Sequence, residues 1–376
     1  MKIGITCYPV AGGSGIVATE LGQQLASRGH DVHFISYAMP FRLDKFDSRM
    51  MYHSVETTAY PLFKHDPYTL PLAAKMADVA RSENLDILHV HYAIPHATCA
   101  YLAKSLLQSG GHHVPKIITT LHGTDITLVG VDPSFFDITR FSIQASDGIT
   151  AVSHYLAEET QEVFRIDKPI RVVHNFFDPL RFKPSSADCS RKQFVTDDEL
   201  LIGHVSNFRP VKRVTDVIDI FDRIQTELPA KLILIGEGPD TILARRQITK
   251  RNLASKVLFL GNQSRPEALL PCVDLFLMPS QEESFGLAAL EALACGVPVV
   301  GSAGTGLMEV IECGVNGYLF PVGDTASMAR AGIDLLKDKH RWLRFKTAAS
   351  ERVRQKFSAE KIVSEYEQYY TEVLNG

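Results

Sequence analysis

Cysteine is scarce in this chain, and long apolar runs are missing. Its 376 residues include 6 cysteines, none of them arranged as CxxC, so the sequence predicts reduced, buried thiols and no disulfide framework. No run approaches the roughly 18 consecutive apolar residues of a membrane span. Residues 1–5 enter a predicted strand directly, without the apolar segment of an export signal. We expect a cytoplasmic protein with no stable membrane association.

An excess of charge of one sign is also missing. Lysine and arginine number 39 against 43 aspartates and glutamates, a formal net charge of −4. A protein that binds nucleic acid would need a basic face, so no nucleic-acid partner is expected. The 45% of apolar and 22% of charged residues are ordinary for a globular protein, and the length suits two domains.

What the sequence does contain is an alternation of short apolar runs with longer helical patterns. The runs that predict strands are residues 3–6, 32–36, 87–91, 117–121 and 148–152, and then 201–205, 231–235, 257–260, 275–278 and 297–301. The helical patterns include residues 16–28, 70–82 and 214–227. Strands that alternate with helices predict βαβ units. The expected fold class is therefore α/β, with two doubly wound Rossmann-like domains facing a cleft.

The same pattern predicts the domain boundaries. We expect an N-terminal domain at 1–177, a polar linker with two prolines at 178–199 and a C-terminal domain at 200–350. Residues 351–376 are helical in period and are expected to pack back on the N-terminal domain. Ligands of doubly wound sheets bind beyond the carboxyl ends of the strands, so the segments that follow the strands are the candidate site.

A glycine-rich turn, residues 12–15, follows the first predicted strand and precedes a helix. Its three glycines let backbone N–H groups approach an anion at the helix N-terminus. The spacing of Gly13, Gly15 and Ala18 also matches a dinucleotide fingerprint, but the second predicted strand does not end in the carboxylate that would hold a ribose. The turn therefore favours a phosphate or carboxylate site over NAD, with a plain tight turn as the alternative.

Histidines gather around the third and fourth predicted strands. They are His89, His91, His96, His112, His113 and His122. Residues i and i+2 of a strand share a face, but no cysteine or acidic residue lies beside them at ligand spacing, so a metal is the weaker interpretation. Tyr92 is a better candidate for a substrate contact. His122 either contacts a polar ligand or belongs to a turn in which Asp125 caps a helix.

Two charged motifs follow strands of the second half. Arg209, Lys212 and Arg213 concentrate positive charge that suits a diphosphate, with a solvated basic loop as the alternative. Glu283 and Glu291 are separated by seven residues, and Glu291 falls in a helix otherwise made of leucine and alanine. A buried carboxylate needs a partner, which vicinal sugar hydroxyls can supply. The alternative is that Glu291 faces water.

Residues 279–300, with this pair of glutamates, resemble the signature of the retaining GT-B glycosyltransferases of family 4. The other segments that carry the resemblance follow in the order of that family along essentially the whole chain: 12–15, 122–125, 174–178, 209–212 and 316–317. Within the family, the segments CYPVAGGSGIVATELG, SNFRPVKR and QEESFGL are similar to the members that transfer N-acetylglucosamine from UDP-N-acetylglucosamine to L-malate, the first step of bacillithiol synthesis. In one departure, Asn207 stands where many members have an arginine, and Arg209 is the candidate replacement for it.

The resemblance implies a role for each motif on the donor side. The donor-binding residues would be Gly13, Ser14, Gly15, Asn207, Arg209, Lys212, Glu283, Ser284, Phe285, Gly286, Leu287 and Glu291. The catalytic set would be His122, Arg209, Lys212 and Glu283. Arg209 and Lys212 would neutralise the departing diphosphate, Glu291 would bind the uridine ribose and Glu283 the sugar hydroxyls. Malate would attack from the front face, and the leaving phosphate would accept its proton.

The acceptor residues are expected in the N-terminal domain. They would be Ser14, Tyr92, Thr120, Arg140 and Asn175, with Arg140 as the charge partner of a malate carboxylate. No DxD-type motif ends a predicted strand, so we expect no cofactor and no bound metal, and activity should survive EDTA.

Alternatives remain at this point. Another acceptor, such as an inositol phosphate, a lipid or a polysaccharide, keeps the enzyme class, but residues 41–49 mix both signs of charge and do not make the basic amphipathic helix of a lipid-binding enzyme. A sensor of nucleotide sugars would not need a neutralised leaving group. A UDP-N-acetylglucosamine 2-epimerase would need no acceptor. A homo-oligomer stays open.

Overall fold

The computed structural model describes the chain except for residues 11, 44–46, 58–67 and 185–190. Two compact units form, Met1–Asn175 with Glu360–Gly376 and Phe176–Ala359, and each is described by itself. The predicted linker at 178–199 falls within the second unit, and its boundaries stay a prediction. Residues 185–190 of that linker, and 44–46 of the segment weighed for a lipid acceptor, lie outside the described residues.

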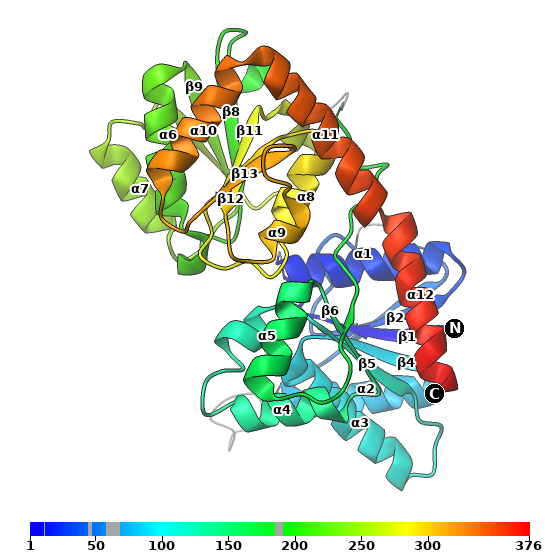
Figure 1. Ribbon diagram of the computed structural model, residues 1–376. Helices are drawn as coiled ribbons and strands as arrows, with labels where there is room; N and C mark the ends of the chain where they lie inside the picture. Colours follow the sequence, from blue (N-terminus) through cyan, green and yellow to red (C-terminus); the bar gives the residue numbers. More distant parts are fainter. Residues whose placement is uncertain (11, 44–46, 58–67, 185–190) are drawn as a thin grey trace. The chain divides into compact units, whose positions relative to one another are not determined.

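The first unit is a seven-stranded parallel sheet with helices on both faces (Figure 1). In spatial order its strands are β3 (Met50–Ser54), β2 (Asp31–Ser36), β1 (Lys2–Thr6), β4 (Ile87–His91), β5 (Lys116–Leu121), β6 (Gly148–Ala151) and β7 (Arg171–Val172). Its helices are α1 (Gly13–Ser27), α2 (Thr69–Glu83), α3 (Thr98–Ser109), α4 (Phe136–Ala145), α5 (His154–Phe164) and α12 (Ala359–Asn375), with short π-helical turns η1 (Ala93–Ala97) and η2 (Thr124–Leu128). The central strands are buried along nearly their whole length, which explains their continuous apolar runs.

The second unit is a six-stranded parallel sheet, again covered on both faces. In spatial order its strands are β10 (Val257–Gly261), β9 (Ala230–Ile235), β8 (Leu200–Val205), β11 (Leu275–Met278), β12 (Val299–Ser302) and β13 (Gly317–Phe320). Its α-helices are α6 (Val214–Glu227), α7 (Thr241–Lys250), α8 (Leu287–Ala294), α9 (Leu307–Val310), α10 (Thr325–Lys337) and α11 (Lys339–Phe357). Short 3₁₀ turns are η3 (Arg191–Gln193), η4 (Pro210–Lys212), η5 (Pro266–Ala268) and η6 (Leu270–Cys272).

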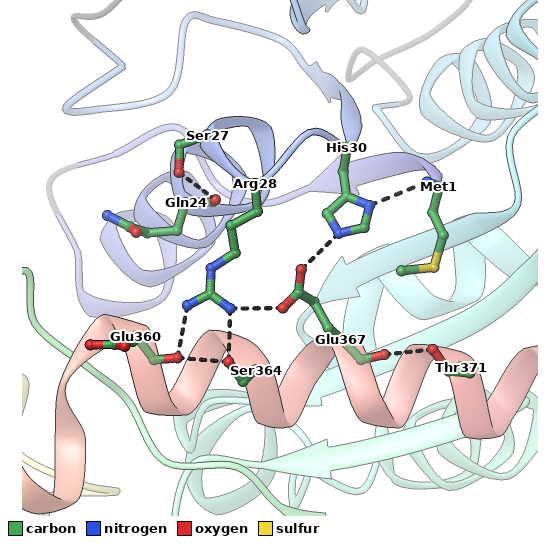
Figure 2. A network of polar contacts seen from close by, with 9 residues as sticks. All are labelled: Met1, Gln24, Ser27, Arg28, His30, Glu360, Ser364, Glu367 and Thr371. Carbon is green, nitrogen blue, oxygen red and sulfur yellow. Dashed lines mark hydrogen bonds and ion pairs between the residues drawn. The ribbon is translucent and has the colours of Figure 1, made fainter.

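Helix α12, at the end of the chain, packs on the first unit. Tyr370 is fully buried and its hydroxyl lies 2.7 Å from Nδ1 of His89, on β4. Figure 2 shows a second attachment, where Glu367 accepts from Arg28 at 2.7 Å and lies 2.9 Å from Nε2 of His30. Arg28 also donates to the carbonyl oxygen of Glu360. Polar contacts at the end of α1 and apolar burial over the sheet therefore hold the last helix in place.

The predicted fold class is confirmed, since both units are parallel α/β sheets of the doubly wound kind. Every predicted strand is present, with its ends within two residues of the prediction. Three strands were not predicted, β3, β7 and β13. β3 and β13 are half-buried edge strands without a continuous apolar run, and β7 has two residues, so none has the pattern that marks a buried strand.

The cysteines need two corrections. Cys7, Cys99 and Cys295 are free and buried, but Cys313 is free and exposed and Cys272 is disulfide-bonded, so the expectation of reduced, buried thiols is wrong at these two positions. Cysteines bond when the fold brings their Cα atoms within about 7 Å, which spacing along the sequence does not reveal. Among the described helices, none is both long enough and apolar enough to cross a bilayer.

Candidate active site

Each sheet has one place where the strand order reverses direction along the chain. In the first unit β1 lies between β2 and β4, and in the second β8 lies between β9 and β11. Ligands of open parallel sheets bind at such points, beyond the carboxyl ends of the strands. The predicted motifs follow these strands: the turn at 12–15 follows β1, Tyr92 follows β4, the segment 206–213 follows β8 and the segment 279–286 follows β11.

In the second unit the two segments meet through a partly buried ion pair. Nζ of Lys212 lies 2.7 Å from Oε1 of Glu283, and the Ser280 hydroxyl donates to the same oxygen at 2.9 Å. The backbone N–H of Gln281 donates to the carbonyl oxygen of Val211 at 2.7 Å. Glu283 is only 7% exposed, so this carboxylate is held out of water by one cation and one hydroxyl.

The three basic residues of this loop are not equivalent. Lys212 faces Glu283, whereas Nε of Arg213 donates to Asp216 in the first turn of α6. Arg209 is exposed and makes no ion pair with any residue that the structure describes. Asn207 is half-buried, and its Oδ1 is buried without a hydrogen-bond partner among the described residues. Arg209 and Asn207 therefore have bonding capacity that a ligand can use, whereas Arg213 is already paired with Asp216.

Helix α8 begins where the predicted donor loop ends. Gly286 has a φ of +93°, and a Cβ there would lie 2.4 Å from Cδ2 of Leu307, so this position requires glycine. Ser284, Phe285 and Leu287 surround that glycine at the start of the helix. Glu291 is 4% exposed, so the alternative that it faces water is wrong. The helix is buried around Glu291, which the leucine and alanine composition already indicated.

In the first unit the glycine turn forms the N-terminus of α1. A Cβ on Gly15 would lie 2.4 Å from the carbonyl oxygen of Tyr8, whereas a Cβ on Gly13 would meet nothing within 4 Å. Packing therefore requires glycine at 15 and not at 13. Gly13 is exposed, Ser14 is half-buried, and no acidic side chain lies in the first turn. This leaves an open helix N-terminus whose dipole favours an anion.

Asp125 does not cap a helix. It is fully buried, and its carboxylate accepts from the backbone N–H groups of Ala93 at 2.9 Å, Gly123 at 2.9 Å and His122 at 3.2 Å. The N-cap residue of the turn η2 is Gly123, so the capping interpretation is wrong. Burial raises the pKa of Asp125, although the N–H groups oppose that shift. This side chain joins the loop after β4 to the loop after β5.

His122 and Tyr92 lie together at these two loops. Their rings stack with centroids 5.8 Å apart, and Tyr92 has a φ of +100°, a strained conformation for a side chain of this size. Thr120 lies deeper: it is fully buried, and its hydroxyl bonds His89 at 2.7 Å and Thr150 at 2.6 Å. Both ring nitrogens of His89 are thereby occupied, by Thr120 and by Tyr370, which leaves neither for a metal.

The other two predicted acceptor residues come from different parts of the unit. Arg140 is on α4, which packs against the turn η1 after Tyr92. Its Nε is buried without a partner among the described residues. Asn175 follows β7, the edge strand, and its Oδ1 is buried and equally unpartnered within the described chain. Unpaired buried polar atoms are rare in folded proteins and mark places for a polar ligand or water.

Two residues of these clusters have contacts that the sequence does not predict, although His91 is among the histidines considered above for a metal. Ser280 bonds Glu283, and Nδ1 of His91 lies 2.8 Å from Nε2 of His122. Ser280 stands three residues before Glu283 in the same loop, but no pattern in the sequence indicates that the two side chains bond each other. The contact of His91 joins two strands, and spacing along the chain gives no sign of it.

Comparisons with known proteins agree along the whole chain. Residues 11–181 match the family described as Glycosyltransferase Family 4, and residues 187–352 match Glycosyl transferases group 1. The chain is 49% identical over 375 residues to the N-acetyl-alpha-D-glucosaminyl L-malate synthase of Bacillus anthracis, which covers 100% of this chain and 97% of that protein. It is 29% identical over 364 residues to a D-inositol 3-phosphate glycosyltransferase of Mycobacterium avium, with 87% of this chain and 81% of that protein covered.

A similar fold occurs in the crystal structure of Anabaena Alr3699/HepE in complex with UDP and glucose. The TM-score is 0.81 at 20% identity, with 99% of each chain covered. At this identity the likeness concerns the fold alone.

Proposed function

The chain belongs to the glycosyltransferases of group 1 and family 4, and on this premise we propose that it transfers N-acetylglucosamine from UDP-N-acetylglucosamine to the hydroxyl of L-malate, with retention of configuration. The products are N-acetyl-α-D-glucosaminyl L-malate and UDP. The observation that carries the proposal is the likeness over the full length to a malate synthase. The relatives named for an inositol phosphate acceptor are much less similar.

The donor is bound by the second unit. Arg209 and Lys212 supply positive charge to the diphosphate, and Glu283 accepts from the sugar hydroxyls. Lys212 and Glu283 are 2.7 Å apart, so each is the other's partner until the donor brings a diphosphate and hydroxyls to replace them. Glu291 accepts from the uridine ribose. Asn207 and residues 284–287 complete this site, and Gly13, Ser14 and Gly15 contribute an anion-binding helix N-terminus.

The acceptor is bound by the first unit. Malate carries two carboxylates and therefore needs donors. Arg140 supplies charge from α4, and Ser14, Tyr92 and Asn175 supply polar contacts. Thr120 acts indirectly: its buried hydroxyl is already bonded to His89 and Thr150, so it supports the acceptor site from behind the residues that contact malate.

In the reaction, the bond between the anomeric carbon and the UDP oxygen breaks, and a bond from the malate hydroxyl forms on the same face. The hydroxyl proton passes to the departing phosphate oxygen, so no base on the protein is needed. Arg209 and Lys212 act where negative charge develops, on the leaving diphosphate, and this is where fixed charges lower a barrier most. His122 contacts the sugar.

The experiment is UDP release from UDP-N-acetylglucosamine with L-malate, with D-malate and with neither. Strong dependence on L-malate, with an α-linked product by NMR, supports the proposal. Release without any acceptor would indicate hydrolysis or an epimerase. No release under any condition would mean that the acceptor is not malate but another acceptor used in this family. Glu283→Gln should lower kcat by about 100-fold or more, and Glu282→Gln, the neighbouring half-buried carboxylate, is its matched control.

A further inference from the structure

We propose that His91 is a positioning residue: by donating a hydrogen bond to Nε2 of His122, it holds the His122 ring as the tautomer that carries its proton on Nδ1. His122 then presents a donor N–H to its ligand and cannot act as a base. This inference rests on the proposed function, in which His122 contacts the sugar. It assigns a role to a buried histidine that takes no part in the reaction described above.

The contact is built by two neighbouring strands. His91 is the last residue of β4, and it pairs in register with Thr120 of β5, so His122 lies two residues further along the same side of the sheet. Nδ1 of His91 lies 2.8 Å from Nε2 of His122. The two rings stack with centroids 5.1 Å apart and an angle of 27°. The side chain of His91 is fully buried, so it is out of reach of a ligand.

Both rings are neutral near pH 7. Burial lowers the pKa of His122 to about 3 and holds the pKa of His91 well below its usual range, with the neighbouring histidines adding to the shift. Each neutral ring carries one proton, and in the bond between them one nitrogen donates and the other accepts. Which of the two nitrogens donates depends on the hydrogen-bond partners of the other ring nitrogens.

Nε2 of His91 decides it. That nitrogen is buried and has no partner among the described residues. If His122 were the donor, His91 would carry its proton on Nε2, as a buried N–H without an acceptor. If His91 is the donor, only an acceptor is left unpaired, and unpaired buried acceptors are tolerated better than unpaired buried N–H groups. His91 therefore donates from Nδ1, and the proton of His122 is on Nδ1.

His96 supports this assignment. Its Nδ1 lies 2.6 Å from the carbonyl oxygen of His91. A carbonyl only accepts, so His96 also carries its proton on Nδ1 and leaves a buried, unpartnered Nε2 in the described part of the unit. The protein therefore tolerates an unpaired ring acceptor in its interior at His96, where the carbonyl partner fixes Nδ1 as the donor.

The His122 ring is fixed on the remaining sides as well. Tyr92 stacks on it, and Asp125 accepts from the His122 backbone N–H. His122 is half-buried, and no residue of the described chain bonds its Nδ1. This N–H is the group left for a ligand. A donor there strengthens as an oxygen gains negative charge, and it cannot compete for the malate proton, which goes to the departing phosphate.

The first test reads the tautomer directly, in the full chain with histidine labelled with ¹⁵N. Protonated and unprotonated ring nitrogens resonate in separate ranges, so NMR with and without UDP assigns each ring. We expect His122 to be protonated on Nδ1 and unprotonated on Nε2. A proton on Nε2 of His122 would overturn the inference. Because this reading needs no turnover, it stands whether or not malate proves to be the acceptor.

The second test uses three variants in the malate-dependent assay. His91→Leu removes the donor and should lower kcat by about 10- to 100-fold, with both KM values within about threefold. His91→Asn keeps a donor N–H at the position of Nδ1 and should restore most of kcat. His96→Asn, which changes a buried histidine that does not bond His122, is the matched control and should keep kcat. Equal loss of kcat in His91→Leu and His91→Asn would mean that His91 only fills space, and would refute its role.

Discussion

The two units satisfy the polar side chains of their candidate sites in different ways. In the second unit charge meets charge, as Lys212 contacts Glu283 and Ser280 completes the pair. In the first unit burial lowers the pKa of His91 and His122, and these two rings bond each other. Several buried polar atoms there have no partner among the described residues: Nε2 of His91, Nε2 of His96, Nε of Arg140 and Oδ1 of Asn175. In the candidate site of the second unit, Oδ1 of Asn207 is the one such atom among the described residues.

This difference separates two tasks. Opposite charges placed beyond β8 and β11 suit a substrate whose charge changes during the reaction, such as a diphosphate that departs. Unpaired and neutral groups beyond β4 and β5 suit recognition of a small polar molecule, which supplies the missing partners when it binds. We therefore expect the loss of Lys212 in the second unit to reduce turnover, and the loss of Arg140 in the first unit to reduce affinity for the acceptor.

The largest effect should follow Lys212→Ala. The change removes positive charge from the leaving diphosphate, and it leaves Glu283 buried with Ser280 and without its cation. We expect kcat to fall by about 100- to 1000-fold, measured as UDP release at saturating donor and malate.

Arg213→Ala is the matched control for that loss. Arg213 lies next to Lys212 in sequence, but its side chain bonds Asp216 on α6, and such partly exposed pairs contribute little. Activity should stay within about threefold of wild type. A comparable loss in both variants would show that the loop needs positive charge in general and not Lys212 in its contact with Glu283.

The next largest effect should be confined to the KM for the acceptor. Arg140→Ala removes a guanidinium whose Nε is buried and unpartnered within the described residues. If it binds a malate carboxylate, the KM for malate should rise by about 10- to 100-fold, since a lost partner of a buried charge costs about 2 kcal/mol or more. The KM for UDP-N-acetylglucosamine should hardly change. Equal increases in both KM values would remove Arg140 from the acceptor site.

Most of the fold could be predicted from the sequence because its central strands are buried on both faces. Residues 275–278, for example, are a continuous apolar run, and their bounds agree with β11. The edge strand β3 could not be predicted, because it is half-exposed and its side chains do not follow a buried pattern. The disulfide at Cys272 depends on proximity in the folded chain, which spacing along the sequence does not reveal.

The candidate site also contains parts that the sequence predicts and parts that it does not. The segments at 209–213 and 279–291 carry charge in a short stretch of sequence, so their motifs point to a diphosphate and a sugar. The contacts of His91 with His122, and of Asp125 with the loop after β4, join residues 31 or 32 positions apart in sequence. Only the register of adjacent strands creates them. Sequence patterns identify the residue types of such a network but not its bonds.

The smallest effect on activity is expected for alanine substitutions of Gly13 and Gly15, two glycines of one turn that should respond differently. In Gly15→Ala the new Cβ would lie 2.4 Å from the carbonyl oxygen of Tyr8 and 2.9 Å from that of Val10. The backbone must move, so unfolding free energy should fall by about 1–3 kcal/mol, seen as a lower thermal midpoint.

Gly13→Ala gives the opposite pattern. Its Cβ would meet no atom within 4 Å, so the thermal midpoint should be kept. The methyl group would instead stand where a phosphate approaches the N-terminus of α1, and the KM for UDP-N-acetylglucosamine should rise by about threefold to tenfold, a loss of about 1 kcal/mol. A Gly13→Ala enzyme with unchanged donor KM would mean that no anion approaches this backbone. The proposed role of Gly13 in donor binding would then be withdrawn.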